Sequence, residues 1–157
     1  MDNWKFPPRL KIYEALGAIA DHRVEMSSAG AVVTSSSRHK HYEVVYNAER
    51  GAIGSNDNGS YWVGYLGYPA IAVLMLHGQL PFDASIAALV SDIQWKELND
   101  RYEGRYDDVE QSVRERIESS DATSLPRLDR LIDAVEERLR ESLPRRANTA
   151  AKPPEGW

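Results

Sequence analysis

The sequence predicts an α+β domain with an N-terminal helix, a small antiparallel sheet of three to five strands, a buried apolar helix and long charged C-terminal helices. Three observations lead to this prediction. Apolar residues first recur at helical spacing, short β-branched segments between turn residues follow, and helical spacing then returns to the end of the chain. A length of 157 residues is the usual size of one domain.

The first predicted helix covers about residues 8–22 and follows the helix-initiating pair Pro7 and Pro8. Its apolar positions near helical spacing are Leu10, Ile12, Tyr13, Leu16, Ile19 and Ala20. Gly17 inside this helix costs roughly 1 kcal/mol relative to alanine. We therefore expect a neighbouring element to pack closely against Gly17.

Short segments that alternate or are β-branched predict the strands. The turn residues Ser28, Ala29 and Gly30 separate the first two strands, and residues 47–51 form a later turn. Because the strands are short and closely spaced, we expect an antiparallel meander. The predicted strands cover about residues 23–27, 31–34, 40–47 and 52–55, and residues 61–66 form either a fifth strand or an aromatic loop.

Residues 70–77 are apolar on every side, with Pro69 at the predicted helix start and Gly78 as a C-terminal stop. A helix without a polar face belongs in the middle of a core. Asp83 then caps a long helix that continues to about residue 117, with an interruption near Gly104.

The last predicted helix runs from Pro126 to Leu143 and has one apolar stripe between highly charged faces. We expect residues 1–120 to form the α+β domain, 121–144 to form a packing or oligomerisation arm, and 145–157 to be a disordered tail. A stripe of this size must be covered, and its spacing suits pairing with another helix. The predicted interface residues are Leu128, Leu131, Ile132, Val135 and Leu139.

Composition excludes several classes of chemistry. The chain has no cysteine, which excludes disulfides, thiolate catalysis, zinc fingers and iron–sulfur clusters. The net charge of −5 weighs against tight non-specific binding to nucleic acid. No apolar run approaches the roughly 20 residues that span a bilayer, and the N-terminus lacks a signal peptide's apolar segment. We expect a soluble cytoplasmic protein without a cofactor, since no phosphate-loop, dinucleotide, EF-hand or nucleophile-elbow motif is present.

His39 and His41 are the residues with the most evident chemical potential. On a strand they share a face, which suits metal ligation or acid–base chemistry on a phosphate-bearing substrate. A metal needs a third ligand, for which Asp57 or Glu43 is the candidate. The alternative interpretation of these alternating polar residues is a solvent-exposed strand face.

A nucleic-acid interface is a second hypothesis for the same region. Arg38 and Lys40 would contact phosphates while Tyr42 and Trp62 stack on bases of a single strand. The small number of cations in an acidic chain weighs against this hypothesis.

Residues 55–69 combine four aromatic residues with three glycines directly before the apolar helix. The Asn/Asp/Gly cluster at the start of this segment predicts a tight turn. Tyr61, Trp62, Tyr65 and Tyr68 then form either a binding surface or the crowded corner of the core, and Gly64 opens space beside them.

These patterns contain no complete catalytic constellation. The leading hypothesis from the sequence is therefore a non-enzymatic binding or accessory protein that acts through protein contacts, as a homo-oligomer joined by residues 126–143. An enzyme centred on His39, His41 and Asp57, and a single-stranded nucleic-acid binder, remain the alternatives.

Overall fold

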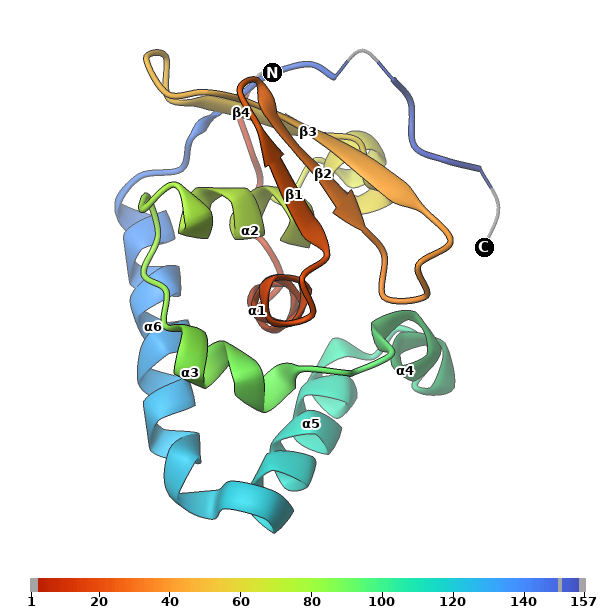
Figure 1. Cartoon of the computed structure of the whole chain (residues 1–157), viewed down its shortest axis with the longest axis vertical. Helices are drawn as coiled ribbons and strands as arrows, with labels where there is room; N and C mark the ends of the chain where they lie inside the picture. The colour runs from red at the N-terminus through yellow and green to blue at the C-terminus, as the bar shows by residue number, and fades with distance from the viewer. Residues whose placement is uncertain (1–2, 150, 156–157) are drawn as a thin grey trace.

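A central helix, α1 (Leu10–Ala20), separates a five-stranded sheet from most of the other helices in the computed structural model (Figure 1). The sheet and α2 (Tyr68–Leu76) lie on one side of α1. On the other side lie α3 (Ala84–Ala87), α5 (Tyr106–Asp121) and α6 (Leu125–Glu141). Residues 3–149 and 151–155 are described. This arrangement confirms the predicted α+β class with a leading helix, a small sheet and C-terminal helices.

The first four strands form an antiparallel meander in chain order, as their short connections predict. The fifth strand comes from the end of the chain and runs parallel to β4, which makes the sheet mixed. The strands are β1 (Val24–Ser27), β2 (Gly30–Thr34), β3 (His41–Asn47), β4 (Ala52–Ser55) and β5 (Arg145–Arg146).

The segment after β4 is not a strand. Residues Gly59–Val63 form one turn of π-helix, and Gly64 ends it with φ +94°. The left-handed backbone at Gly64 is readily adopted by glycine and breaks any extended run through residues 61–66. The aromatic residues of this segment therefore lie on a tight loop rather than along a strand.

The apolar helix α2 occupies the core, as its sequence predicts. All residues from Pro69 to Met75 are buried, and α2 contacts α1 and the four strands of the meander. Inward-facing side chains of the sheet, among them Val33, Val44 and Ile53, join the same core. The lack of a polar face on α2 matches this burial.

Close packing explains Gly17 in the middle of α1. A Cβ atom at this position would lie 2.8 Å from Trp95 Nε1 and 3.0 Å from the backbone oxygen of Val90. The Trp95 indole can pack this closely against α1 because residue 17 has no side chain. This packing compensates for the low helix propensity of glycine.

The charged region predicted as one long helix divides into three helices and a 3₁₀ turn. Asp83 caps the first of them by accepting hydrogen bonds from the backbone nitrogens of Ser85 and Ile86. The breaks occur at Asp92 and Gly104, which have φ values of +58° and +76°. The helices are α3 (Ala84–Ala87), α4 (Trp95–Arg101) and α5 (Tyr106–Asp121).

The last helix, α6 (Leu125–Glu141), packs against its own chain. It contacts α1 and α5, and Arg9 at the start of α1 forms ion pairs with Glu110 of α5 and with Asp133 and Glu136 of α6. The predicted interface residues belong to the same core as α1 and α2: Leu128, Leu131, Ile132, Val135 and Leu139. The stripe is thus covered without a second chain, and self-association stays a prediction.

The end of the chain lies along the sheet, where the sequence predicts a disordered tail. Arg145 and Arg146 form β5, and the nitrogen of Ala147 donates to the oxygen of Ile53 at 2.9 Å. The amide of Asn56 donates to the oxygen of Lys152 at 3.2 Å. The edge of β4 offers backbone hydrogen bonds that composition does not reveal. Residues 150, 156 and 157 of the predicted tail lie outside the described residues.

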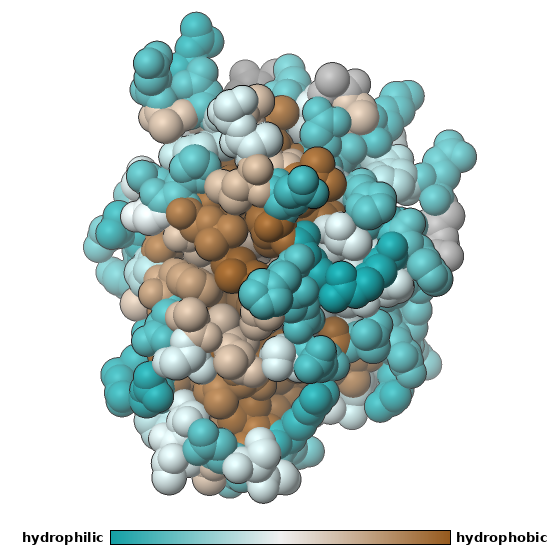
Figure 2. Space-filling model, viewed as in Figure 1, coloured by the Kyte–Doolittle hydropathy of each residue, from teal (hydrophilic) through white to brown (hydrophobic). Residues whose placement is uncertain are grey.

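The surface seen in Figure 2 has apolar side chains gathered over α2 and α3, bordered by charged residues. Leu76, at the end of α2, is an apolar side chain that is 40% exposed. Among the helices of the described residues, none has the length and apolar character needed to cross a membrane.

Candidate functional site

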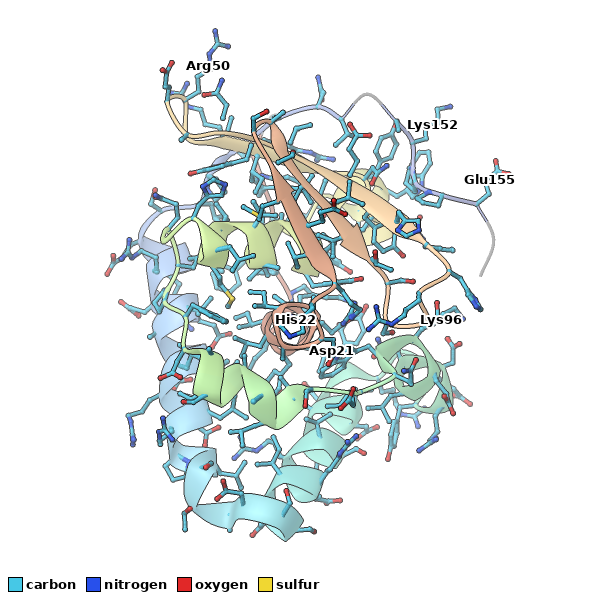
Figure 3. The ribbon with its side chains drawn as sticks, viewed as in Figure 1. Asp21, His22, Arg50, Lys96, Lys152 and Glu155 are labelled. Carbon is cyan, nitrogen blue, oxygen red and sulfur yellow. The ribbon has the colours of Figure 1, made fainter. Side chains whose placement is uncertain are left out.

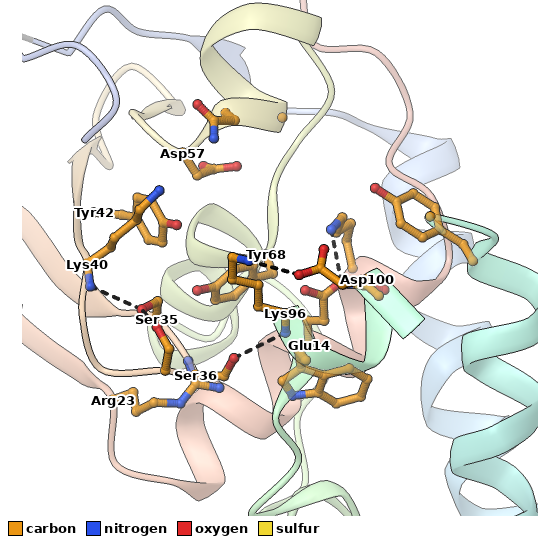
Figure 4. Close-up of a pocket in the computed structure, with 18 of the residues that line it drawn as sticks. Glu14, Arg23, Ser35, Ser36, Lys40, Tyr42, Asp57, Tyr68, Lys96 and Asp100 are labelled. Carbon is orange, nitrogen blue, oxygen red and sulfur yellow. Dashed lines mark hydrogen bonds and ion pairs between the residues drawn. The ribbon is translucent and has the colours of Figure 1, made fainter. Parts of the chain in front are cut away.

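A pocket of about 400 Å³ opens between the sheet, the N-terminal half of α1 and α4 (Figure 4). Its walls come from segments that are distant in the sequence, so only the fold assembles it. Lys11 and Glu14 come from α1, and Arg23 precedes β1. The other lining residues are Ser35, Ser36, Ser37, Lys40, Tyr42, Asp57, Asn58, Gly59, Tyr65, Tyr68, Trp95, Lys96, Asn99, Asp100, Glu103, Gly104 and Tyr106.

The loop after β4 holds Asp57 in the pocket wall. Asp57 is buried, and its Oδ1 accepts a hydrogen bond from Ser55 Oγ at 2.5 Å, while its Oδ2 accepts one from the nitrogen of Ser60 at 3.2 Å. The nitrogen of Gly67 donates to Ser60 Oγ at 3.0 Å. A Cβ atom on Gly67 would overlap Asp57 Oδ2, so glycine is needed for this close approach. The turn predicted from the Asn/Asp/Gly cluster is therefore the support of a buried carboxylate.

A buried ion pair on α1 forms another wall. Lys11 Nζ lies 2.9 Å from Glu14 Oε2, and it also lies 4.9 Å from the centre of the Tyr106 ring. Burial lowers the pKa of Lys11, but Glu14, Tyr65 and Tyr106 together raise it more, so that the net pKa is above its ordinary value. Lys11 stays cationic at neutral pH.

Arg23 contributes a buried guanidinium with unused hydrogen-bonding capacity. The residue is 3% exposed, and its Nη1 donates to the backbone oxygen of Thr34 at 2.7 Å. Asp21 Oδ2 lies 3.7 Å from Nε, which is beyond hydrogen-bond distance. The buried Nε and Nη2 atoms both lack a hydrogen-bond acceptor in the described part of the chain.

Tyrosine rings form the middle of the pocket. The rings of Tyr42 and Tyr68 meet edge to face, with centroids 6.3 Å apart. Burial raises the pKa of Tyr42, Tyr65 and Tyr68, and neighbouring charges modify this effect. For Tyr68, the Arg23 guanidinium lowers the pKa and the net shift is still upward. These hydroxyls therefore remain protonated at neutral pH.

The pocket has two ends of opposite character. Figure 4 shows Asp57 at one end, Arg23 with Ser35 and Ser36 at the other, and Tyr68 between them. The lining as a whole contains four cationic side chains (Lys11, Arg23, Lys40, Lys96) and four acidic ones (Glu14, Asp57, Asp100, Glu103). This balance favours a neutral or zwitterionic molecule over a highly charged one.

The predicted metal or acid–base set is not assembled at this pocket. Asp57 lines it, whereas His39 and His41 are exposed and do not. Strand β3 begins at His41, so His39 lies in the preceding loop and the alternation of a strand does not relate the two histidines. Across residues 3–149 and 151–155, no group of three or more His, Cys, Asp or Glu side chains is arranged to hold a metal ion.

The predicted nucleic-acid set is divided in the same way. Lys40 and Tyr42 line the pocket. Arg38 is exposed, with Nη2 3.4 Å from the backbone oxygen of Asp21, and Trp62 is 65% exposed. These four residues do not form one surface around a strand.

The predicted aromatic surface is also divided. Tyr65 and Tyr68 line the pocket, whereas Tyr61 and Trp62 contact each other outside it with ring centroids 4.7 Å apart. Lys11, Glu14 and Arg23 belong to no sequence motif that predicts a site. One available signal was Glu14 itself, which interrupts the run of small and apolar residues from Tyr13 to Ala18.

A protein-family model described as Uncharacterised conserved protein UCP014422 matches residues 4–144, which include every residue that lines the pocket. No curated protein matches the chain. No solved structure matches it.

Proposed function

The chain belongs to the family described as uncharacterised conserved protein UCP014422, and we propose that it is a binding protein whose pocket holds a small polar molecule. The volume of about 400 Å³ lies within the range of small-molecule sites. The proposal keeps the class predicted from the sequence, a non-enzymatic binding protein, but replaces a protein partner by a small ligand.

The observation that carries this proposal is that several buried polar atoms of residues lining the pocket have no hydrogen-bond partner among the described residues. The Nε and Nη2 atoms of Arg23 and the Oδ1 atom of Asn99 are buried without a hydrogen-bond partner among the described residues. Buried polar groups in proteins are nearly always hydrogen-bonded, because an unsatisfied group costs roughly 1–3 kcal/mol. Several such groups in one pocket are best explained by a polar ligand that satisfies them.

The electrostatics of the pocket favour binding over acid–base catalysis. A general base works best when its pKa lies near the operating pH. Lys11, Tyr42, Tyr65 and Tyr68 all have pKa values moved further from neutrality. These four groups are suited to donating hydrogen bonds rather than to taking protons from a substrate.

The apolar stripe of α6 no longer supports a protein partner. Its residues Leu128, Ile132 and Val135 are completely buried within the chain. The feature that motivated self-association is therefore explained by intramolecular packing, and the pocket offers the better-defined site.

Ligand-observed NMR with a panel of small polar metabolites tests the proposal. The wild type is compared with Ser36→Trp, which places a large side chain in the pocket wall, and with Arg50→Trp as a control. Arg50 is at the tip of the β3–β4 turn, far from Lys96 at the pocket (Figure 3). Circular dichroism and melting temperature establish that both variants are folded.

We expect some panel members to bind the wild type and Arg50→Trp but not Ser36→Trp. The bound ligand should also raise the melting temperature, since a ligand at 100 times its Kd stabilises the folded state by about 2.7 kcal/mol. Absence of binding across the panel, or equal binding to Ser36→Trp, would contradict the proposal.

A further inference from the structure

We infer that the ligand of this pocket has a carboxylate or phosphate at one end, bound by the Nε–Nη2 edge of Arg23, and an amine at the other end, bound by Asp57. This inference rests on the proposed function, because it names the class of molecule that the same pocket accepts. It goes further in fixing the orientation of the ligand and the residue that selects it.

One edge of the Arg23 guanidinium has no hydrogen-bond partner among the described residues. Nε and Nη2 point in parallel from one side of a guanidinium, which matches two oxygens of a carboxylate or a phosphate. Both atoms are buried without an acceptor, while Nη1 on the other side is used by the oxygen of Thr34. The backbone bond thus fixes the guanidinium with its anion-binding edge unpaired by any hydrogen bond in the described part of the chain.

Asp21 is the competing partner for this edge. Its Oδ2 lies 3.7 Å from Nε, and its Oδ1 accepts a hydrogen bond from the nitrogen of Asp92 at 2.8 Å. Figure 3 shows Asp21 at the end of α1, and this residue does not line the pocket. Asp21 therefore reduces the free-energy cost of burying the positive charge of Arg23, but it does not supply the missing hydrogen bonds.

The surroundings of Arg23 suit an anion. The β2–β3 loop contributes the hydroxyls of Ser35, Ser36 and Ser37 to the pocket, and Lys96 lines it from α4, whereas the side chain of Lys40 extends from this loop toward Asp57 (Figure 4). Asp100 is the acidic neighbour here, and it is paired with Lys96 at 2.9 Å. Cationic and hydroxyl groups thus predominate at this end.

Asp57 lies at the end of the pocket opposite Arg23, and its carboxylate suits an amine. Its two oxygens each accept one hydrogen bond from the protein, at 2.5 Å from Ser55 Oγ and 3.2 Å from the nitrogen of Ser60. A carboxylate oxygen has two lone-pair sites, so each oxygen retains capacity for a further donor. The carboxylate is buried and fixed in direction, as an amine-binding group should be.

A bare ion cannot contact both ends at once, because they lie on opposite sides of Tyr68 (Figure 4). Tyr42 and Tyr68 lie between Asp57 and Arg23, and their rings supply apolar surface for a short carbon chain or ring (Figure 4). A molecule with only one charged group leaves one end of the pocket unsatisfied. The pocket therefore selects molecules that have both groups.

Isothermal titration calorimetry with defined probes tests this inference. The bifunctional probes are 4-aminobutanoate, which has a carboxylate, and O-phosphoethanolamine, which has a phosphate. Butanoate, butylamine and inorganic phosphate are the probes with one kind of group. The variants are Arg23→Gln, Arg23→Lys, and Arg38→Gln as the control, because Arg38 is a neighbouring arginine outside the pocket lining.

At least one bifunctional probe should bind the wild type more tightly than any single-group probe, and the tighter of the two identifies the anion as carboxylate or phosphate. Loss of charge-assisted hydrogen bonds predicts an affinity about 10- to 100-fold lower for Arg23→Gln. Arg23→Lys should show a comparable loss because an ammonium lacks the two-pronged edge. Arg38→Gln should change affinity by no more than about twofold, as expected for a charge outside the site.

The Nε–H resonance of Arg23 in the wild type gives a second readout that does not depend on a variant being folded. Binding at this edge should shift that resonance, and the resonances of other arginines should move less. Butylamine binding as tightly as 4-aminobutanoate, an unchanged affinity in folded Arg23→Gln, or an unmoved Nε–H signal in the presence of a bound probe would each overturn the inference. If the metabolite panel still binds, only this inference fails; if neither panel nor probes bind, the proposed function fails with it.

Discussion

Lys11 Nζ and Glu14 Oε2 lie 2.9 Å apart on one face of α1, with only 12% and 6% of their side chains exposed. Two opposite charges one helical turn apart are usually a surface feature. Here the pair lies in the wall of the pocket, where the low local dielectric strengthens its attraction and makes each charge costly without the other.

Breaking this pair from one side should destabilise the protein strongly. Lys11→Met alone or Glu14→Leu alone leaves one buried charge without its partner, and each should cost about 3–5 kcal/mol. The double variant Lys11→Met, Glu14→Leu should recover most of that loss because no charge remains buried. Urea unfolding of all four proteins measures the coupling, and additive single effects would show that the two groups do not interact.

The protein should lose stability at alkaline pH. Burial lowers the Lys11 pKa, but Glu14, Tyr65 and Tyr106 together raise it to a net value above that of the unfolded chain, and burial raises the pKa of Tyr42, Tyr65 and Tyr68. The folded state therefore keeps protons that the unfolded state releases above about pH 10. Stability should be complete below that pH and fall as pH rises further. Urea unfolding from pH 8 to 11 measures this, and a flat profile would contradict the pKa directions.

Gly67→Ala should weaken ligand binding by displacing Asp57. The new Cβ atom would overlap Asp57 Oδ2 and would also approach Ser60 Oγ at 2.5 Å. Overpacking of this kind costs about 1–3 kcal/mol, and the displaced carboxylate should reduce the affinity for a bifunctional probe. Gly78→Ala is the control, since its Cβ meets nothing within 4 Å and only its φ of +74° adds strain. Equal effects of the two variants on binding would contradict the role given to Gly67.

Much of the fold follows from patterns with a direct physical cause. The all-round apolar residues Ala70 to Met75 lie buried in a helix, and Asp83 caps α3 as its position predicts. The turn residues in the sequence correctly predict where the first four strands begin and end to within about one residue. These features are local, so neighbouring residues in the sequence contain the information that determines them.

The pocket could not be derived in the same way because it depends on tertiary contacts. Arg23 and Asn99 lie 76 positions apart in the numbering, and no sequence pattern relates them. Strand β5 likewise depends on the free edge of β4, which local composition does not show. His39 and His41 predict a metal or acid–base site mainly because of their residue type, and both are exposed in the structure.

The burial of α6 predicts that its stripe stabilises the single chain. Ile132 is completely buried, so Ile132→Ala should cost about 2–5 kcal/mol. The unfolding midpoint should not change with protein concentration over a hundredfold range. A midpoint that rises with concentration would instead support the self-association through residues 126–143 that the sequence predicts.

Chemical-shift mapping tests most directly whether the pocket between β3, α1 and α4 binds a small polar ligand. Backbone ¹H–¹⁵N spectra of the wild type are recorded during titration with the best ligand of the metabolite panel. The amides of Ser35, Ser36, Ser37, Lys40, Asn58, Gly59 and Lys96 should shift together with one dissociation constant, because these residues line one pocket. Shifts confined to the exposed surface of Trp62 and Val63, with the pocket amides unmoved, would contradict it.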